Sequence, residues 1–140
     1  FESSYNGILA CPKNSKKVLI HDAARPFISQ EIITSCIEAL NNYEAVVTSI
    51  QTTDTVIRVK NMEILQVEDR NQIFLNQTPQ GFKYKTILDA HKNRTGSVTD
   101  DISLLDLSET KCKVIKGSKK NIKITTNDDI QFAMHILNQD

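Results

Sequence analysis

The stretch Val18–Pro26, which reads VLIHDAARP, decides the fold predicted for this chain. Its apolar start runs directly into Asp22 and, three residues later, Arg25. A continuous apolar run is typical of a buried strand covered on both faces, as in parallel sheets. Ligands of open α/β sheets bind outside the carboxyl ends of strands. We therefore expect Asp22 and Arg25 at a ligand-binding edge, although an aspartate after a strand also commonly forms a turn or caps a helix.

The composition describes one soluble domain. The chain has 140 residues, 39% of them hydrophobic, with 17 basic and 17 acidic side chains. This balance argues against a general nucleic-acid or membrane-surface binder, which needs a basic excess. No apolar run reaches membrane-spanning length. Cys11, Cys36 and Cys112 lack metal-binding or redox spacing, so we expect reduced thiols in a cytoplasmic protein.

Helical and strand patterns alternate along the chain. We predict helices over about residues 1–10 and 29–40, strands at 18–20 and 45–50, and hence a βαβ unit with a parallel strand pair. Residues 54–67 read as a β-hairpin, which is marginal alone and needs a surface to pack on, from a second subunit or its own domain.

The carboxyl-terminal half continues this alternation. Residues 77–82 read as a loop, followed by a helix to about His91 and a short helix capped by Thr99 or Asp100. Strands are expected at 114–116 and 121–124, before a last helix with a Thr126–Asp129 capping box. The predicted fold is an α/β sheet covered by helices on both faces.

Polar residues follow or interrupt these apolar elements in four places: Asp22 with Arg25, Asp69 with Arg70, Thr78 with Thr99 and Asp100, and Lys123. Taken singly, they are explained by turns, surface ion pairs, helix caps or solvated edge charges. Taken together, they suit an anionic sugar phosphate, because phosphoryl-type transfer needs positioning and charge neutralisation. His21 adjoins Asp22, but successive strand side chains point to opposite faces, so we do not expect the two to act together.

A set of motifs in fixed order now identifies a family: His21–Pro26, Thr53–Thr55, Asp69–Arg70, Gln77–Phe82, Thr99–Asp101 and Asn121–Thr125. They closely resemble the 2-C-methyl-D-erythritol 4-phosphate cytidylyltransferases of the non-mevalonate isoprenoid pathway. The resemblance implies a Rossmann-like nucleotidyltransferase sheet and a protruding β-arm, about residues 52–70, that interlocks two subunits. It implies transfer of CMP from CTP to methylerythritol phosphate with Mg²⁺, releasing pyrophosphate.

The resemblance also implies roles for the substrate side of the site. Asp22 would hold the sugar-phosphate hydroxyls near the metal-bound nucleotide, and is the one residue expected near the metal itself. Arg25 would support that loop and the substrate. Arg70 would reach into the partner subunit's site and hold the substrate phosphate. Thr78 and Thr99 would hydrogen-bond the same substrate.

On the nucleotide side, Lys123 would neutralise charge around the α-phosphate and, with Asp22, carry the catalysis. Ser3 aligns with a serine beside the cytosine, and Ala23 with a residue that lines the nucleotide. The stretch 87–91 and the doubled aspartate Asp100–Asp101 look like members fused to a cyclodiphosphate synthase domain. We therefore expect CTP and a sugar-alcohol phosphate as ligands, a homodimer, and no nucleic-acid or membrane partner.

The family's Gly-rich triphosphate loop would lie before Phe1, so the chain is expected to be the carboxy-terminal two-thirds of one cytidylyltransferase domain and inactive alone. Two alternatives stay open at this point. Pentitol-phosphate cytidylyltransferases, acting on ribitol 5-phosphate, share most of these motifs. A truncated, non-catalytic dimerisation or ligand-sensing module would also account for the missing loop.

Overall fold

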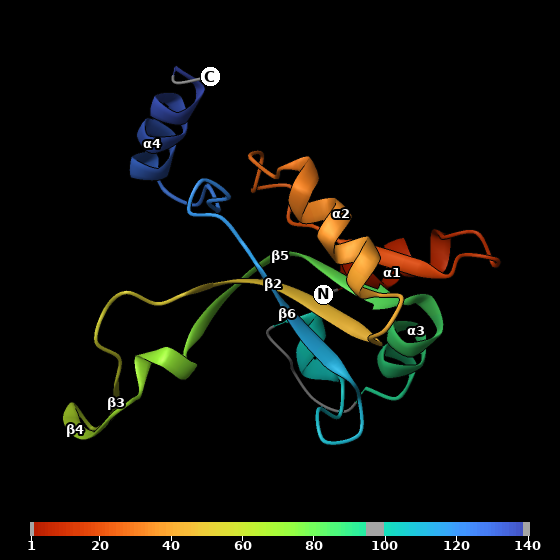
Figure 1. Ribbon diagram of the computed structural model, residues 1–140, viewed down its shortest axis with the longest axis horizontal. Helices are drawn as coiled ribbons and strands as arrows, with labels where there is room; N and C mark the ends of the chain where they lie inside the picture. Colours follow the sequence, from red (N-terminus) through yellow and green to blue (C-terminus); the bar gives the residue numbers. More distant parts are fainter. Residues whose placement is uncertain (1, 95–99, 139–140) are drawn as a thin grey trace.

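The computed structural model describes residues 2–94 and 100–138. Its helices are α1 (Glu2–Ala10), α2 (Gln30–Ala39), α3 (Tyr84–Lys92) and α4 (Asn127–Leu137), with short 3₁₀ helices η1 (Arg70–Gln72) and η2 (Asp101–Leu104). Its strands are β1 (Lys17–Ile20), β2 (Ala45–Gln51), β3 (Ile57–Lys60), β4 (Glu63–Val67), β5 (Phe74–Lys83) and β6 (Cys112–Lys116). Figure 1 shows a central sheet, with β3–β4 and α4 projecting from it.

The sheet has the order β1-β5-β2-β6. β6 runs parallel to β2, whereas β5 is antiparallel to both β1 and β2. The prediction that β1 and β2 form a parallel pair was therefore wrong. They run in the same direction, but β5 lies between them, and a local pattern cannot show that a later strand will insert there.

β5 itself corrects a second expectation, because residues 77–82 are part of a strand and not a loop. The pairing with β2 jumps from Val47↔Gln80 to Thr48↔Gln77, so Thr78 and Pro79 occupy a bulge. A proline in a bulge removes no ladder hydrogen bond, which is why a central strand tolerates it. The Thr78–Pro79 peptide bond is cis.

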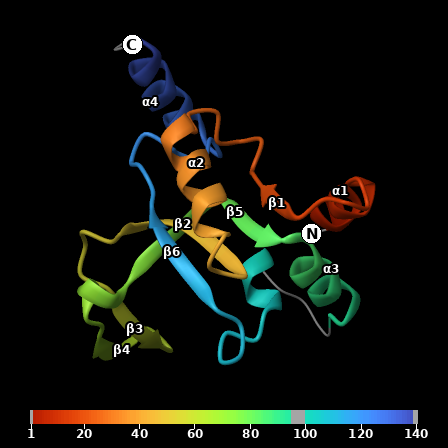
Figure 2. The same ribbon diagram turned by 45° about the vertical axis from the view of Figure 1, so that its right-hand side comes forward.

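Apolar side chains cover both faces of the sheet, as the α/β prediction required. Ala45 of β2 joins a cluster with Ile8 and Ile87, from α1 and α3. Its neighbour Val46 joins a second cluster with Cys36 and Leu40, at the end of α2. Successive strand residues point to opposite faces, so α2 covers one face and α1 with α3 the other. Figures 1 and 2 show α1 and α3 side by side.

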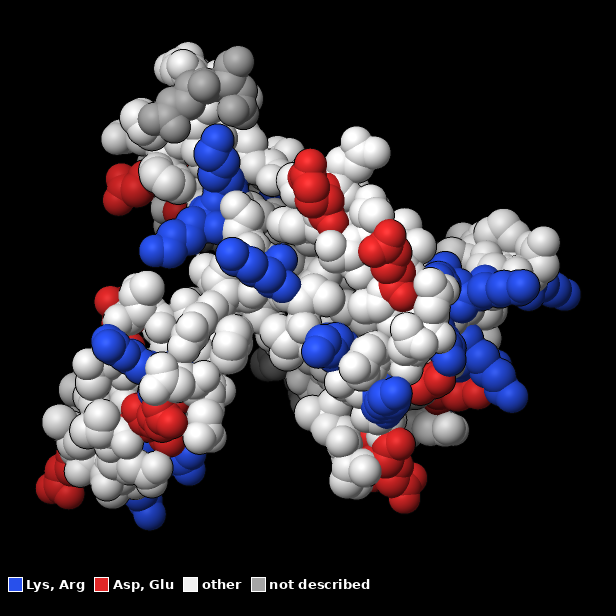
Figure 3. All heavy atoms as spheres, in the orientation of Figure 1, with Lys and Arg blue, Asp and Glu red and all other residues white. Residues whose placement is uncertain are grey.

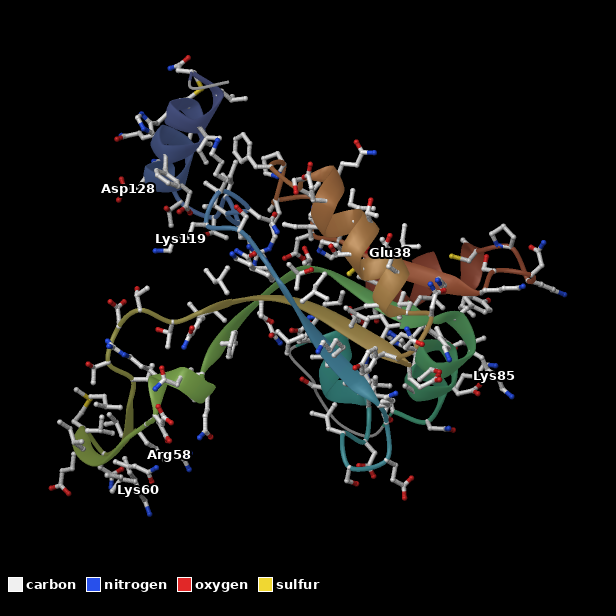
Figure 4. The ribbon with its side chains drawn as sticks, in the orientation of Figure 1. Glu38, Arg58, Lys60, Lys85, Lys119 and Asp128 are labelled. Carbon is white, nitrogen blue, oxygen red and sulfur yellow. The ribbon has the colours of Figure 1, made fainter. Side chains whose placement is uncertain are left out.

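The predicted hairpin is confirmed as a separate two-stranded sheet, β3–β4, here called the arm. Asn61 and Met62, both at positive φ, form its two-residue turn, the geometry that matches strand twist. Every residue of both strands is exposed, and Figure 4 shows Arg58 and Lys60 far from the main sheet. Figure 3 shows charges of both signs on the arm.

The connection from β6 to α4 was predicted to contain a strand at 121–124, which is wrong. The segment joins neither of the two sheets in the described part of the chain. Ile124 N–H instead donates to the Ala24 carbonyl, at 2.8 Å. The capping box is confirmed, and hydrogen bonds from Thr125 and Thr126 lower the pKa of Asp129 to about 2.

A stability prediction follows from Gly81, near the carboxyl end of β5. A Cβ at this position would lie 3.0 Å from both Leu19 Cδ2 and Leu40 Cδ1, and Leu40 is fully buried. We expect Gly81→Ala to lower the free energy of unfolding by about 1–3 kcal/mol through overpacking. Urea denaturation measures this loss of stability. Gly7→Ala, on helix α1, is the control, because a Cβ at Gly7 has no atom within 4 Å. This variant should leave the free energy of unfolding unchanged or raise it by up to about 1 kcal/mol.

Candidate active site

One pocket of about 270 Å³ gathers residues from segments far apart in the chain. It lies where the loop after β1 meets β5, η2, the start of α1 and the β6–α4 connection. Its lining residues are Ser4, Ile20, Asp22, Arg25, Asn76, Gln77, Thr78, Gln80, Asp100, Asp101 and Lys123. The structure thus brings together four predicted site residues, Asp22, Arg25, Thr78 and Lys123.

The two cations of the pocket, Arg25 and Lys123, converge on one carboxylate oxygen of Asp22. Lys123 Nζ lies 3.0 Å from Asp22 Oδ2, and Arg25 Nε lies 3.6 Å from the same oxygen. The Arg25 side chain is only 12% exposed, whereas that of Lys123 is 47% exposed. Arg25 is therefore part of the wall, and Lys123 is the cation free to meet a ligand from solvent.

The hydroxyl of Thr78 ties β5 to the loop that carries Asp22. It accepts the Asp22 backbone N–H at 3.0 Å and lies 3.0 Å from His21 Nδ1. His21 Nε2 lies 2.9 Å from the Arg25 carbonyl, which can only accept, so Nε2 carries the hydrogen. In the neutral imidazole Nδ1 is then the acceptor, and the Thr78 hydroxyl donates to it. Sequence reasoning missed this role because it placed His21 on a strand, whereas β1 ends at Ile20.

The acidic side of the pocket was predicted in part, because the sequence grouped Asp100 with Thr78 but gave no role to Gln80 or His91. Gln80 Nε2 donates to Asp100 Oδ1 at 2.6 Å, and Asp100 caps η2 as predicted. Asp101 bridges the buried His91, 3.0 Å from its Nε2, and the Ser4 hydroxyl, at 3.2 Å. These contacts join α1, α3, β5 and η2. Asp101 was noted in the sequence only as part of a family feature.

The remaining predicted residues lie elsewhere. Ser3 and Ala23 line an adjoining hollow, which shares Ser4, Ile20 and Asp22 with the pocket. Arg70 does not reach the pocket of its own chain: it lies on η1, near the base of the arm, where its Nη1 donates to the Thr53 carbonyl at 3.3 Å. Thr99 lies outside the described residues.

The pocket offers few protein ligands for a divalent cation. Within residues 2–94 and 100–138, no group of three or more His, Cys, Asp or Glu side chains gathers around a metal position. Mg²⁺ commonly binds through one or two carboxylates together with substrate phosphates and water. Asp22 could supply one such carboxylate, so the residues fit a Mg²⁺ ion held mainly by a bound nucleotide, but not a protein-only cage. Among residues 2–94 and 100–138, none of the helices has the length and hydropathy of a transmembrane span.

The unequal exposure of the two cations yields a stability prediction. We expect Arg25→Ala to lower the free energy of unfolding by about 2 kcal/mol or more, because it removes a largely buried side chain and its hydrogen bond to the Asn121 carbonyl. Lys123→Ala also removes a positive charge beside the Asp22 carboxylate, but at the surface. It should change the free energy of unfolding by less than about 1 kcal/mol. Equal losses in urea denaturation would contradict this division of roles.

Comparison with known proteins gives one consistent result. The family model described as 2-C-methyl-D-erythritol 4-phosphate cytidylyltransferase matches residues 1–139. A protein of that name from Prochlorococcus marinus (strain MIT 9215) is 40% identical over 136 residues, which cover 94% of this chain and 61% of that protein. The "Bifunctional enzyme IspD/IspF" of Lawsonia intracellularis is 42% identical over 137 residues, covering 95% of this chain and 34% of that protein.

Solved structures agree. The crystal structure of the 4-diphosphocytidyl-2C-methyl-D-erythritol synthase from Anaerococcus prevotii superposes with a TM-score of 0.92 at 36% identity, covering 97% of this chain and 63% of that one. The chain thus spans less than two thirds of the length of these relatives. Because the family model spans almost the whole chain and the fold matches, the chain belongs to the 2-C-methyl-D-erythritol 4-phosphate cytidylyltransferase family.

Proposed function

We propose that this protein is a cytidylyltransferase that transfers CMP from CTP to 2-C-methyl-D-erythritol 4-phosphate and releases pyrophosphate. One observation carries the proposal: Asp22, Thr78 and Lys123 come from three distant segments and meet at one pocket, with Lys123 Nζ 3.0 Å from Asp22 Oδ2. Membership of the family supports the choice of reaction over a non-catalytic module.

The reaction joins two anions. A phosphate oxygen of the sugar-alcohol phosphate attacks the α-phosphorus of CTP, and the bond from this phosphorus to the bridging oxygen breaks. Pyrophosphate leaves with the bonding electron pair. The protein's task is to hold the two phosphates in line and to stabilise the negative charge on the α-phosphate.

Lys123 supplies that stabilisation in the proposed mechanism. The Lys123 side chain is about half exposed, and Asp22 already holds its ammonium group at the pocket. The ammonium group is therefore preorganised to contact the α-phosphate. Asp22 accepts hydrogen bonds from hydroxyls of the acceptor. Thr78 and Thr99 contact the same substrate, and Arg25 holds the Asp22 loop from behind.

In this proposal the nucleotide occupies the hollow that Ser3 and Ala23 line, with Ser3 on the cytosine side and Ala23 against the nucleotide. A Mg²⁺ ion would be bound by the CTP phosphates and by one carboxylate oxygen of Asp22, and it would draw charge from the phosphates during transfer. The chain's own residues orient the two substrates around that ion.

Arg70 serves the site of a second subunit in this proposal. The arm exposes apolar side chains on both strands, among them Ile57, Val59, Ile64 and Val67. An isolated two-stranded hairpin is marginal in water, and an exposed apolar patch marks an interaction surface. We propose that the arms of two copies pair into a homodimer, which brings Arg70 to the substrate phosphate in the partner's pocket.

Two wider features complete the proposal. The Lawsonia relative is named a bifunctional enzyme, and this supports a fusion of the present domain to a cyclodiphosphate synthase. A cytoplasmic location is supported by three cysteines that are all free in the structure.

The function is tested by measuring pyrophosphate release from CTP by the complete gene product. We expect release to require 2-C-methyl-D-erythritol 4-phosphate, and Lys123→Ala to lower kcat by about 100-fold with little effect on KM for CTP, because its charge acts on the transition state. Ribitol 5-phosphate is the matched control substrate. Faster release with ribitol 5-phosphate, or no dependence on either acceptor in a folded protein, would refute the proposal.

The dimer is tested by mixing two inactive variants. Arg70→Ala and Asp22→Ala subunits, refolded together, should recover up to about half of the wild-type activity per mixed dimer, because one pocket then keeps both residues. Subunits mixed without refolding serve as the control. If purified mixed dimers stay inactive, Arg70 acts within its own chain.

A further inference from the structure

Lys123 lies on a segment that has neither helix nor sheet to hold it. β6 ends at Lys116 and α4 begins at Asn127, and the residues between them that carry Lys123 form no ladder with the described strands. Figure 3 shows basic side chains gathered over this connection, where Figure 4 places Lys119. Something other than regular secondary structure must therefore fix the Lys123 ammonium group beside Asp22.

Asn121 provides the contacts that regular structure does not. It is 0% exposed, two residues before Lys123. Its side-chain Nδ2 donates to the Thr78 carbonyl at 2.8 Å. Its own carbonyl accepts from Arg25 Nη1 at 2.9 Å and from Gln77 Nε2 at 3.2 Å. One buried residue thus contacts both the β5 bulge and the loop after β1.

Gln77 closes the same arrangement from the β5 side. Its Nε2 donates to the Ser118 carbonyl at 2.9 Å, and its Oε1 accepts the Ser118 N–H at 3.2 Å. Gly117 leaves room for this amide, since a Cβ there would collide with Gln77 Oε1. The turn before Lys123 is therefore held by two buried amide side chains, while Ile124 is held to Ala24 beyond it.

Packing alone does not account for an amide at position 121. Asn121 Oδ1 is buried and has no hydrogen-bond partner among the described residues. An unpaired buried oxygen costs free energy, which an apolar residue of similar size would avoid. What the amide adds is the donor that reaches Thr78, so its contribution lies in the geometry it imposes on the Lys123 segment.

We propose that Asn121 is a positioning residue, which holds Lys123 at the pocket through the β5 bulge. The proposal rests on the transferase function proposed above, in which Lys123 acts on the α-phosphate. It assigns Asn121 no contact with substrate: its effect on the reaction passes through Lys123.

A double-mutant cycle tests this in the complete gene product. We expect Asn121→Ala to lower kcat by about 10- to 100-fold with little change in KM for CTP, since small misplacements of a catalytic group have effects of that size. In the Lys123→Ala background, the same change should alter kcat by less than about twofold, because the residue it positions is gone. Additive losses in the double variant would overturn the proposal.

Thr48→Ala is the matched structural control. Thr48 is also fully buried, and its hydroxyl donates at 2.7 Å to the carbonyl of Pro79, the residue after Thr78. Both variants thus remove one side-chain hydrogen bond to a carbonyl of the same bulge, and both should lower Tm. Only Asn121→Ala should reduce kcat, and an equal reduction in Thr48→Ala would overturn the proposal. Should Asn121→Ala fail to fold, Asn121→Ser takes its place in the cycle, with the same outcomes.

Crystal structures separate this proposal from the function on which it rests. The Lys123 Nζ to Asp22 Oδ2 distance, 3.0 Å here, should lengthen in Asn121→Ala and persist in Thr48→Ala. A distance that persists in Asn121→Ala removes the positioning role even if the enzyme transfers CMP. If the wild-type protein releases no pyrophosphate from CTP, the function fails, and the distance alone then decides whether Asn121 positions Lys123.

Discussion

The bulge at Thr78 and Pro79 is the constraint on which the site depends. β5 pairs with β1 on one side and with β2 on the other, so its interruption lies in the middle of the sheet. The backbone groups released there are taken up by side chains: the Pro79 carbonyl by Thr48 and the Thr78 carbonyl by Asn121. The Thr78 hydroxyl meanwhile holds the Asp22 loop. A local break in the ladder thereby becomes the place where three remote segments are joined.

The distribution of charge follows from this arrangement. Asp22 lies between a largely buried guanidinium, 3.6 Å from its Oδ2, and a half-exposed ammonium, 3.0 Å from the same oxygen, so Lys123 is the one of these two cations that faces the solvent. The carboxylates of Asp100 and Asp101 are bound instead by Gln80, His91 and Ser4. These hydrogen bonds join η2 to α1, α3 and β5. The Lys123 end of the pocket is therefore the end suited to an anion.

Sequence alone predicted the parts whose signal is local. The apolar run into Asp22 and Arg25 placed both residues at the edge of the sheet, and the Thr126–Asp129 spacing gave the start of α4. Residues 77–82 were mistaken for a loop because proline and glycine usually end strands, and only the pairing with β2 shows the bulge. The isoleucines flanking Lys123 suggested a strand by alternation, but alternation cannot supply a partner strand.

The side-chain amides of Gln77 and Asn121 were not predicted from the sequence as part of the site. Gln77 and Asn121 are uncharged polar residues of a kind usually found at the surface, and nothing in their spacing shows that they meet. Both lie inside the motifs that carry the family resemblance, and those motifs were read for their threonine and lysine. Burial is decided by the tertiary fold, so a polar residue that holds a site from behind is visible only once the segments have been assembled.

The hydrogen of the Thr78 hydroxyl has a further consequence for what the pocket accepts. That hydrogen is directed to His21, while a lone pair of the oxygen already receives the Asp22 N–H. A ligand atom that approaches Thr78 while His21 is neutral must therefore bring a hydrogen of its own. An alcohol satisfies this oxygen, whereas a bare anionic oxygen placed there would meet only lone pairs, so a polyol is distinguished from an acid at this point of the wall.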